Sequence, residues 1–212
     1  MSADWPLRDL VLRTPRLELR PDDDAGLAEL VEVARGGVHP PDEMPFLVPW
    51  TDADPRHPGR GMLQYSWSRR ADLAPERWTL DLLVRRDGRV IGVQGLSGRD
   101  FAVTPEVSTG PWLGLAHQGD GVGTEMRAAV LLFAVDHLGA VRARSSAFSD
   151  NVRSLRVSEE LGYRPDGTST EVRRGRSTLD RRLVLEAADL VRPEWELEVE
   201  GVDGVRELLD AG

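Results

Sequence analysis

Residues 117–125 read His117-Gln118-Gly119-Asp120-Gly121-Val122-Gly123-Thr124-Glu125 and stand between an apolar run and a long helical pattern. Glycines at 119, 121 and 123 allow the backbone amides to turn toward one point. The start of the following helix adds unpaired N–H groups and roughly half a positive charge. The stretch therefore predicts a cradle that binds a phosphate-like anion without a basic side chain.

The residues of this stretch exclude two other phosphate-binding motifs. A dinucleotide-binding turn needs G-x-G-x-x-G at the first strand of a βαβ unit and an acidic residue about 20 positions later. Here the sixth position counted from Gly119 is Thr124, and the stretch lies past the middle of the chain. A P-loop needs Gly-Lys-Ser/Thr, whereas the cradle has no lysine.

Composition bounds the class of protein. The chain has 212 residues, of which 40% are hydrophobic, and this suffices for one large domain with its own core. We expect a single domain over residues 1–212, with a core at about 10–186 and an extension at about 187–212. The absence of cysteine excludes disulfides, a thiol nucleophile and a cysteine metal site, and four scattered histidines form no metal-ligand pattern.

The charge balance is acidic, with 27 Lys and Arg against 36 Asp and Glu, a formal charge of −9. Nucleic acid is not expected as a partner, because neutralisation of phosphates by basic side chains dominates that affinity. The charge would steer a cationic or amine-bearing substrate, although the simpler interpretation, that net charge keeps the protein soluble, is preferred. No segment has the pattern of a leader or the ~20 apolar residues of a membrane span, so we expect a soluble cytoplasmic protein without membrane partners.

Hydrophobic periodicity predicts alternating strands and helices before the cradle. Asp22 to Asp24 supply a cap for the first helix, and Asp87-Gly88 marks the tip of a hairpin. The expected elements are a strand within 10–20, a helix over 22–36, a proline-rich lid over 38–61, a helix over 62–73, hairpin strands over 78–84 and 90–96, and a strand over 107–115.

The second half of the chain continues this alternation. The expected elements are a helix over 122–138, a strand over 141–148, a short helix from Asp150-Asn151 to Leu161, a strand that ends at 182–185, a strand within 195–199 and a helix over 205–209. We find no internal repeat and no low-complexity tract.

Three motifs fit this order of elements: Thr14-x-Arg16-Leu17-x-Leu19-Arg20, Gly119-x-Gly121-x-Gly123-Thr124-Glu125, and Asn151-x-x-Ser154 followed by Leu161-Gly162-Tyr163. Over about residues 10–186 the chain resembles the GNAT superfamily of acyl-CoA N-acyltransferases, in its RimJ/RimL-like branch. Its lid over 44–50 resembles an actinobacterial subgroup, some members of which use succinyl-CoA. The resemblance implies an α/β (α+β) fold with a mixed central sheet, splayed parallel strands and flanking helices.

The resemblance also implies where acyl-CoA binds. In the family, the pantetheine arm lies between two splayed parallel strands, here 112–115 and 141–148. Backbone groups of Leu113, Gly114 and Leu115 would bind pantetheine and polarise the thioester carbonyl. The pyrophosphate would be held by Gln118, Gly119, Asp120, Gly121, Val122, Gly123 and Thr124. A tight turn without a ligand remains the alternative interpretation of the glycines.

Candidates for the acid chemistry follow the second strand. The resemblance implies that Asn151 reaches the pantetheine or acyl group and that Ser154 faces the sulfur, while a helix cap and a surface hydroxyl are the alternatives. Many GNAT enzymes place a tyrosine seven residues after this asparagine to protonate the thiolate, and here that position is Ser158. Ser154, Ser158 or water could serve, and a CoA thiolate needs little help.

A base, or a chain of water, must remove the ammonium proton of the acceptor before the amine attacks. Each candidate is also readable as an ordinary polar residue. The candidates are His39, Asp42, Glu43, Asp81 and Glu106.

The sequence therefore predicts an N-acyltransferase that uses acyl-CoA as co-substrate, with acetyl-CoA as the first choice and succinyl-CoA as the alternative. The acceptor is a primary amine of a small molecule or a protein, attacked directly in a ternary complex. A homo-oligomer is among the partners considered, and the oligomeric state stays open. The missing tyrosine motivates another alternative, a non-catalytic acyl-CoA-binding sensor.

Overall fold

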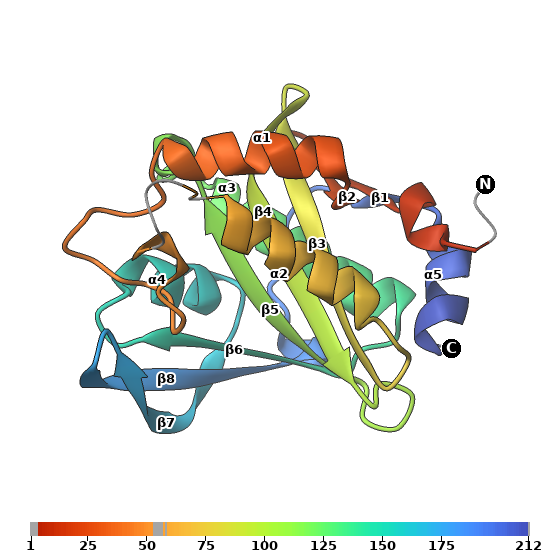
Figure 1. The fold of residues 1–212 in the computed structure, drawn as a ribbon. Coiled ribbons are helices and arrows are strands. Elements are labelled where there is room, and N and C mark those ends of the chain that lie inside the picture. The colour runs from red at the N-terminus through yellow and green to blue at the C-terminus, as the bar shows by residue number, and fades with distance from the viewer. Residues whose placement is uncertain (1–3, 53–56, 58, 212) are drawn as a thin grey trace.

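The computed structural model describes residues 4–52, 57 and 59–211. Among these residues, nine strands form one sheet in the order β7-β8-β6-β5-β4-β3-β2-β1-β9 (Figure 1). Neighbouring strands are antiparallel except for β5 and β6, which are parallel. The predicted mixed sheet with flanking helices is confirmed.

The elements have the following bounds. The strands are β1 Val11–Arg13, β2 Glu18–Pro21, β3 Arg77–Arg86, β4 Arg89–Arg99, β5 Glu106–Leu113, β6 Arg142–Phe148, β7 Arg164–Arg173, β8 Arg176–Glu186 and β9 Glu198–Glu200. The helices are α1 Asp24–Arg35, α2 Arg60–Ala71, α3 Val122–Leu132, α4 Val152–Glu160 and α5 Val202–Leu209.

Helices cover both faces of the sheet (Figure 1). On one face, α1 and α2 pack over an apolar cluster that includes Leu27, Leu83 and Val93. On the other face, α3 is buried in the main core from Glu125 to Leu132. The site described below lies where α3 begins, beside the parallel pair β5–β6.

The first strand differs from the sequence expectation because the chain turns within it. Residues 10–20 form the two antiparallel strands β1 and β2, paired at Leu12 and Leu19. Between them the amide of Thr14 donates to the carbonyl of Leu17 at 3.0 Å. Pro15, which cannot donate from its own nitrogen, occupies this turn.

Three further boundaries differ. Regular helix α3 ends at Leu132, and the chain continues through the wider turn Phe133–His137. Strand β7 was not expected as a separate element. The late strand is Glu198–Glu200 instead of a segment within 195–199, and it pairs with β1.

The parallel pair opens along its length. Strands β5 and β6 are paired only from Glu106 and Arg142 to Ser108 and Arg144. Gly114 donates to the carbonyl of Ile91 of β4 at 2.9 Å. Because bonding direction alternates along an antiparallel strand, the backbone groups of Thr109, Pro111 and Leu113 face away from β4 and toward β6. Pro111 has no N–H to donate across this edge.

The lid was expected over residues 38–61, of which 53–56 and 58 lie outside the described part of the chain. Within 38–52, rings pack in a continuous row from His39 through Phe46 and Trp50 to Trp112 of β5. The ring centroids lie 5.8, 5.1 and 5.2 Å apart along this row. The lid is therefore packed onto the strand at whose end the cradle begins.

Candidate active site

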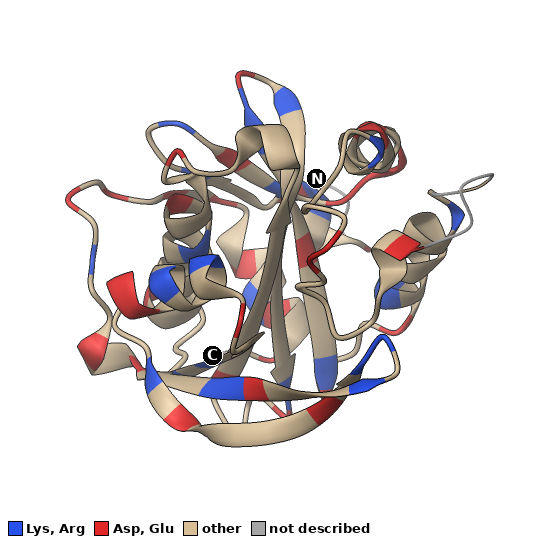
Figure 2. Cartoon of the chain, turned by 90° about the vertical axis from the view of Figure 1, so that its left-hand side faces the viewer, with Lys and Arg blue, Asp and Glu red and all other residues tan. Residues whose placement is uncertain are grey.

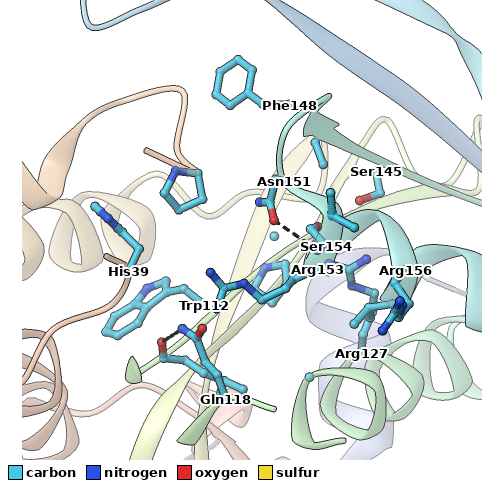
Figure 3. Close-up of a pocket in the computed structure, with 18 of the residues that line it drawn as sticks. His39, Trp112, Gln118, Arg127, Ser145, Phe148, Asn151, Arg153, Ser154 and Arg156 are labelled. Carbon is cyan, nitrogen blue, oxygen red and sulfur yellow. Dashed lines mark hydrogen bonds between the residues drawn. The ribbon is translucent and has the colours of Figure 1, made fainter. Parts of the chain in front are cut away.

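A cavity of about 770 Å³ opens between the diverging ends of β5 and β6 (Figure 3). The start of α3, the helix α4 and the lid complete its walls. Its lining includes Phe46, Thr109, Gly110, Trp112, Leu113, Gln118, Gly119, Gly121, Gly123, Thr124, Arg127, Ser145, Asn151, Arg153, Ser154 and Arg156. Sequence positions from 38 to 180 thus meet around one space.

The cradle has the conformation expected of its glycines. Gly119 and Gly121 adopt φ of 86° and 72°, a left-handed region that only glycine enters readily. Glu125 is the first residue of α3 to donate along the helix, to Gly121 at 3.1 Å. The amides of Val122, Gly123 and Thr124 precede it in the first turn, and no side chain caps this end. The helix therefore presents uncapped N–H groups beside the cavity.

The outer side of the cradle is braced by two arginines. The carbonyl of Asp120 accepts from Arg16 at 2.9 Å, and its carboxylate accepts from Arg86 at 2.8 Å. Buried Glu125 accepts from Thr14 at 2.5 Å and from Arg16 Nε at 2.6 Å. Thr14 and Arg16, before β2, are thus in direct contact with the cradle. Arg16 bonds to the cradle on the side away from the cavity.

Two side chains of the predicted cofactor-binding stretch lie outside the cavity, and two predicted backbone donors are already bonded. The Asp120 side chain points to Arg86, and Val122 is 1% exposed in the core, so neither side chain lines the cavity. Gly114 and Leu115 donate to the carbonyls of Ile91 and Gly37, each at 2.9 Å. Their N–H groups are therefore not available to polarise a thioester, contrary to the prediction.

Gln118 lines the cavity but is engaged with the backbone. Its Nε2 donates to the carbonyls of Val38 at 2.7 Å and Leu113 at 2.9 Å. These two bonds connect the start of the lid to the end of β5, and Figure 3 shows Gln118 at the wall of the cavity. Of the three backbone positions predicted in β5 and its extension, only Leu113 faces the gap, and its carbonyl already has this donor.

Asn151 and Ser154 line the cavity, whereas Ser158 does not. Asn151 caps α4, since its Oδ1 accepts from the amide of Ser154 at 3.1 Å. Ser158 is 1% exposed, donates to the carbonyl of Ser154 at 3.0 Å and accepts from Arg127 at 2.7 Å. The hydroxyl of Ser158 is therefore enclosed between α3 and α4 and does not face the cavity, so its role as a proton donor stays a prediction.

Comparisons with known proteins agree with this architecture. Residues 16–164 match the family described as acetyltransferase (GNAT) domain. This chain belongs to the GNAT acetyltransferase family. The match spans the cradle, both strands of the open pair and α4.

Solved structures share this GNAT fold. Mycobacterium smegmatis RimJ in complex with CoA-disulfide has a TM-score of 0.69 and 18% identity, covering 95% of each chain. A putative ribosomal-protein-serine acetyltransferase from Vibrio cholerae has a TM-score of 0.64 and 19% identity over 84% of this chain and 98% of its own. The putative acetyltransferase yncA from Salmonella typhimurium, solved with acetyl-CoA, has a TM-score of 0.61 and 21% identity over 84% and 98%.

The GNAT chain holds a buried cation that sequence reasoning missed. Arg127 of α3 is 2% exposed, lines the cavity and has no carboxylate partner among the described residues. Burial lowers its pKa, and nearby Tyr163 opposes that effect. Its Nε, the hydroxyl of Tyr163 and Oγ1 of Thr109 are buried without hydrogen-bond partners. Buried polar atoms in this state indicate room for an added acceptor or donor.

The GNAT lid is fastened by arginines from two elements. From the β7–β8 hairpin, Arg173 at the end of β7 donates to the carbonyl of Met44 at 3.1 Å, and Arg174 in the turn pairs with Asp52 at 2.5 Å. From α4, Arg153 binds the carboxylate of Glu43 at 2.9 Å. These bonds close one side of the cavity.

Most of the predicted proton acceptors are occupied in this GNAT domain. His39 has both ring nitrogens engaged, with Pro40 at 2.8 Å and Thr51 at 2.7 Å. Glu43 pairs with Arg153, and Glu106 pairs with Arg142 at 2.6 Å and Arg144 at 2.7 Å. Asp42 is exposed and does not line the cavity. Asp81 remains, and its surroundings are considered below.

Two further findings concern metal ligands and membrane spans. Among the residues that the structure describes, no three His, Asp or Glu side chains are grouped closely enough to hold a metal ion. Within the same residues, no helix has the length and apolar character needed to cross a membrane.

Proposed function

We propose that the chain transfers an acyl group from acyl-CoA to a primary amine by direct attack in a ternary complex, with acetyl-CoA as the first donor. The observation that carries the proposal is the joining of an uncapped helix N-terminus to an open strand edge within one cavity. The first suits a pyrophosphate and the second an extended, amide-bearing arm.

In this proposal the amides at 122–124 hold the pyrophosphate, and Gly119 and Gly121 allow it to approach the backbone. Pantetheine lies along the β6-facing edge of β5, where the groups of Thr109 and Leu113 are directed. The amine then attacks the thioester carbon, the C–S bond breaks, and the thiolate takes a proton. Ser154 is the predicted residue that lines the cavity and carries a hydroxyl for the sulfur.

A charge placed in the cradle tests the donor site. Gly123 and Gly61 are each the second residue of a helix, and a Cβ meets only Val157 at 3.8 Å in the first and nothing within 4 Å in the second. Gly123→Glu is expected to weaken CoA binding more than 100-fold in calorimetry, since a carboxylate repels phosphate at this point. Gly61→Glu, outside the cavity, is the matched control and should bind as the wild type does.

The catalytic part of the proposal is tested by CoA release from acetyl-CoA with a panel of amines, including spermidine and a tetrapeptide with a free N-terminus. Turnover on any of them supports an enzyme. Tight CoA binding without turnover on any amine would favour the acyl-CoA sensor. Unchanged CoA affinity in folded Gly123→Glu would refute the placement of the site.

Succinyl-CoA is a second candidate donor, and Arg127 is the observation that favours it. A succinyl group ends in a carboxylate, which a buried guanidinium without an acidic partner could pair bidentately. If this is right, kcat/KM for succinyl-CoA exceeds that for acetyl-CoA, and Arg127→Met reverses the order while acetyl transfer persists. An unchanged ratio in the folded variant would leave acetyl-CoA as the donor.

A further inference from the structure

Asp81 of β3 lies opposite a glycine in β4, which in turn lies opposite a glycine in β5. The register pairs Asp81 with Gly95 of β4, and Gly95 with Gly110 of β5. Residues directly opposite one another in antiparallel strands project from the same face of the sheet. The row therefore leads from a carboxylate, across two glycines, to Gly110, which lines the cavity.

The space along this row depends on the absence of Cβ atoms. A Cβ at Gly95 would lie 3.0 Å from the carbonyl oxygen of Gly110 and 3.3 Å from Oδ1 of Asp81, whereas one at Gly110 would meet nothing within 4 Å. Strands are spaced by about 4.8 Å, so the row spans roughly 10 Å. A chain of two or three water molecules, each about 2.8 Å from the next, bridges such a distance by hydrogen bonds.

The surroundings of Asp81 keep its proton affinity high. The charged and titratable groups that face it are Asp22, which precedes α1, and Arg69 and Tyr65 of α2. Arg70, the other basic residue here, binds Asp22 at 3.1 Å. Burial and the Asp22 charge raise the pKa of Asp81 to about 6, against a smaller lowering by Arg69. Its Oδ2 is buried without a hydrogen-bond partner.

We propose that Asp81 receives the ammonium proton of the acceptor through water held over Gly95 and Gly110. This inference rests on the proposed function and names the proton acceptor of that reaction. One proton passes from R–NH3⁺ through water to the carboxylate, leaving R–NH2 and a neutral Asp81. The amine nitrogen bonds to the thioester carbon, the C–S bond breaks, and the second nitrogen proton goes to the thiolate, giving the amide and CoA.

The proposal is tested with Asp81→Asn and two amines, ethylamine and the weakly basic 2,2,2-trifluoroethylamine, in the acetyl-CoA assay. General-base assistance contributes roughly 10²-fold or more, so kcat/KM for ethylamine should fall by about that factor at pH 7. The amine that is already neutral at pH 7 should lose less than about threefold. CoA affinity should be unchanged, because Asp81 is outside the cavity lining.

The pH profile separates this role from a structural one. The wild type should gain kcat/KM as pH rises through about 6, following ionisation of Asp81. Asp81→Asn should lack this rise. Its kcat/KM should approach that of the wild type only at a pH where ethylamine is itself neutral. The proposal would be overturned if Asp81→Asn lost kcat/KM equally for both amines, or if its kcat/KM still rose with pH near 6. If the wild type turns over no amine, the proposed function itself fails.

Blocking the row is an independent test. Gly110→Ala adds a methyl group in open space at the cavity end, so the fold should persist. It should lower kcat for ethylamine more than for trifluoroethylamine, whereas Gly61→Ala in α2 should change neither. Equal kcat ratios in Gly110→Ala and the wild type would count against the water route.

Discussion

Asp81 connects the pH dependence of stability to the chemistry proposed for the site. Its pKa is raised to about 6 from the ordinary 3.8, so the folded state holds this proton more tightly than the unfolded state. The ionised carboxylate therefore lowers the free energy of unfolding. This loss of stability is absent below about pH 4 and complete above about pH 6. The pKa shift alone would correspond to a larger loss of stability. Because the side chain is only partly buried, we expect a loss of about 1–2 kcal/mol.

Asp81→Asn should therefore raise the free energy of unfolding by about 1–2 kcal/mol at pH 7.5. The gain should shrink as pH falls from 6 to 4, because the wild-type carboxyl then becomes neutral in both states. Urea unfolding at a series of pH values measures this directly. A gain that is equal at pH 4 and pH 7.5 would show that the asparagine acts through packing instead.

At the level of single residues, the sequence predicted backbone conformation better than side-chain direction. Glycine at 119 and 121 specifies a left-handed turn wherever the chain goes. The direction of Ser158, by contrast, depends on how α3 packs on α4, which no local pattern encodes. Arg127 could have been noticed as a cation inside the apolar stripe of the 122–138 pattern, because charged residues are almost never fully buried without a partner.

Among the elements, the lid owes its position to the ring row that ends on Trp112. Aromatic pairs contribute about 0.5–1.5 kcal/mol each beyond area burial, and Trp50 takes part in two of them. Trp50→Ala should therefore speed hydrogen exchange over residues 38–52. It should also raise KM for the amine about 5-fold or more, while CoA affinity stays within about twofold.

Trp67→Ala provides the control for this lid prediction. Trp67 is 48% exposed on α2 and lies outside the ring row. Its removal should leave both hydrogen exchange at 38–52 and KM unchanged. Equal effects of the two substitutions would mean that the row does not hold the lid.

Elements with a strong local signal were predicted, whereas the polar strand β7, which lacks an apolar pattern, was not. The Asp-Gly hairpin and the capped helix α1 follow from turn and cap chemistry that is local in sequence. Strand β7 is mostly exposed and polar and is interrupted at Gly167, whose φ is 89°. It forms because β8 pairs with it, with a register shift between Pro165 and Thr168.

On the scale of the whole molecule, charges of both signs are interspersed along the chain, as the β7–β8 ribbon shows (Figure 2). Many arginines are paired with carboxylates from distant elements, such as Arg192 with Asp136 at 2.7 Å. The excess of acidic residues is therefore not concentrated on strands β7 and β8. Such exposed pairs contribute little to stability individually.

Residues near the C-terminus pack into the core, and on this ground we propose that the chain folds as one domain. Strand β9 pairs with β1, and Leu209 and Val205 of α5 are 0% exposed within the main cluster. Leu209→Ala should cost about 2–5 kcal/mol. At this chain length it should lower the melting temperature by about 5–15 °C, in a single transition, in calorimetry.

Val172→Ala is the matched control, because Val172 is 70% exposed on β7 and surface changes usually stay within about 0.5 kcal/mol. A second, separate transition in Leu209→Ala would show instead that residues 187–212 fold as their own unit.

Pro111, in the gap between β5 and β6, bears on the rate at which a ligand can enter the site. With no N–H at this edge, the two strands have no complete ladder to form when the site is empty. A ligand arriving from solution would then meet a groove that is already open, with no strand pairing to break first. We expect the observed rate of CoA association to rise linearly with CoA concentration, without the plateau that a slow opening step imposes.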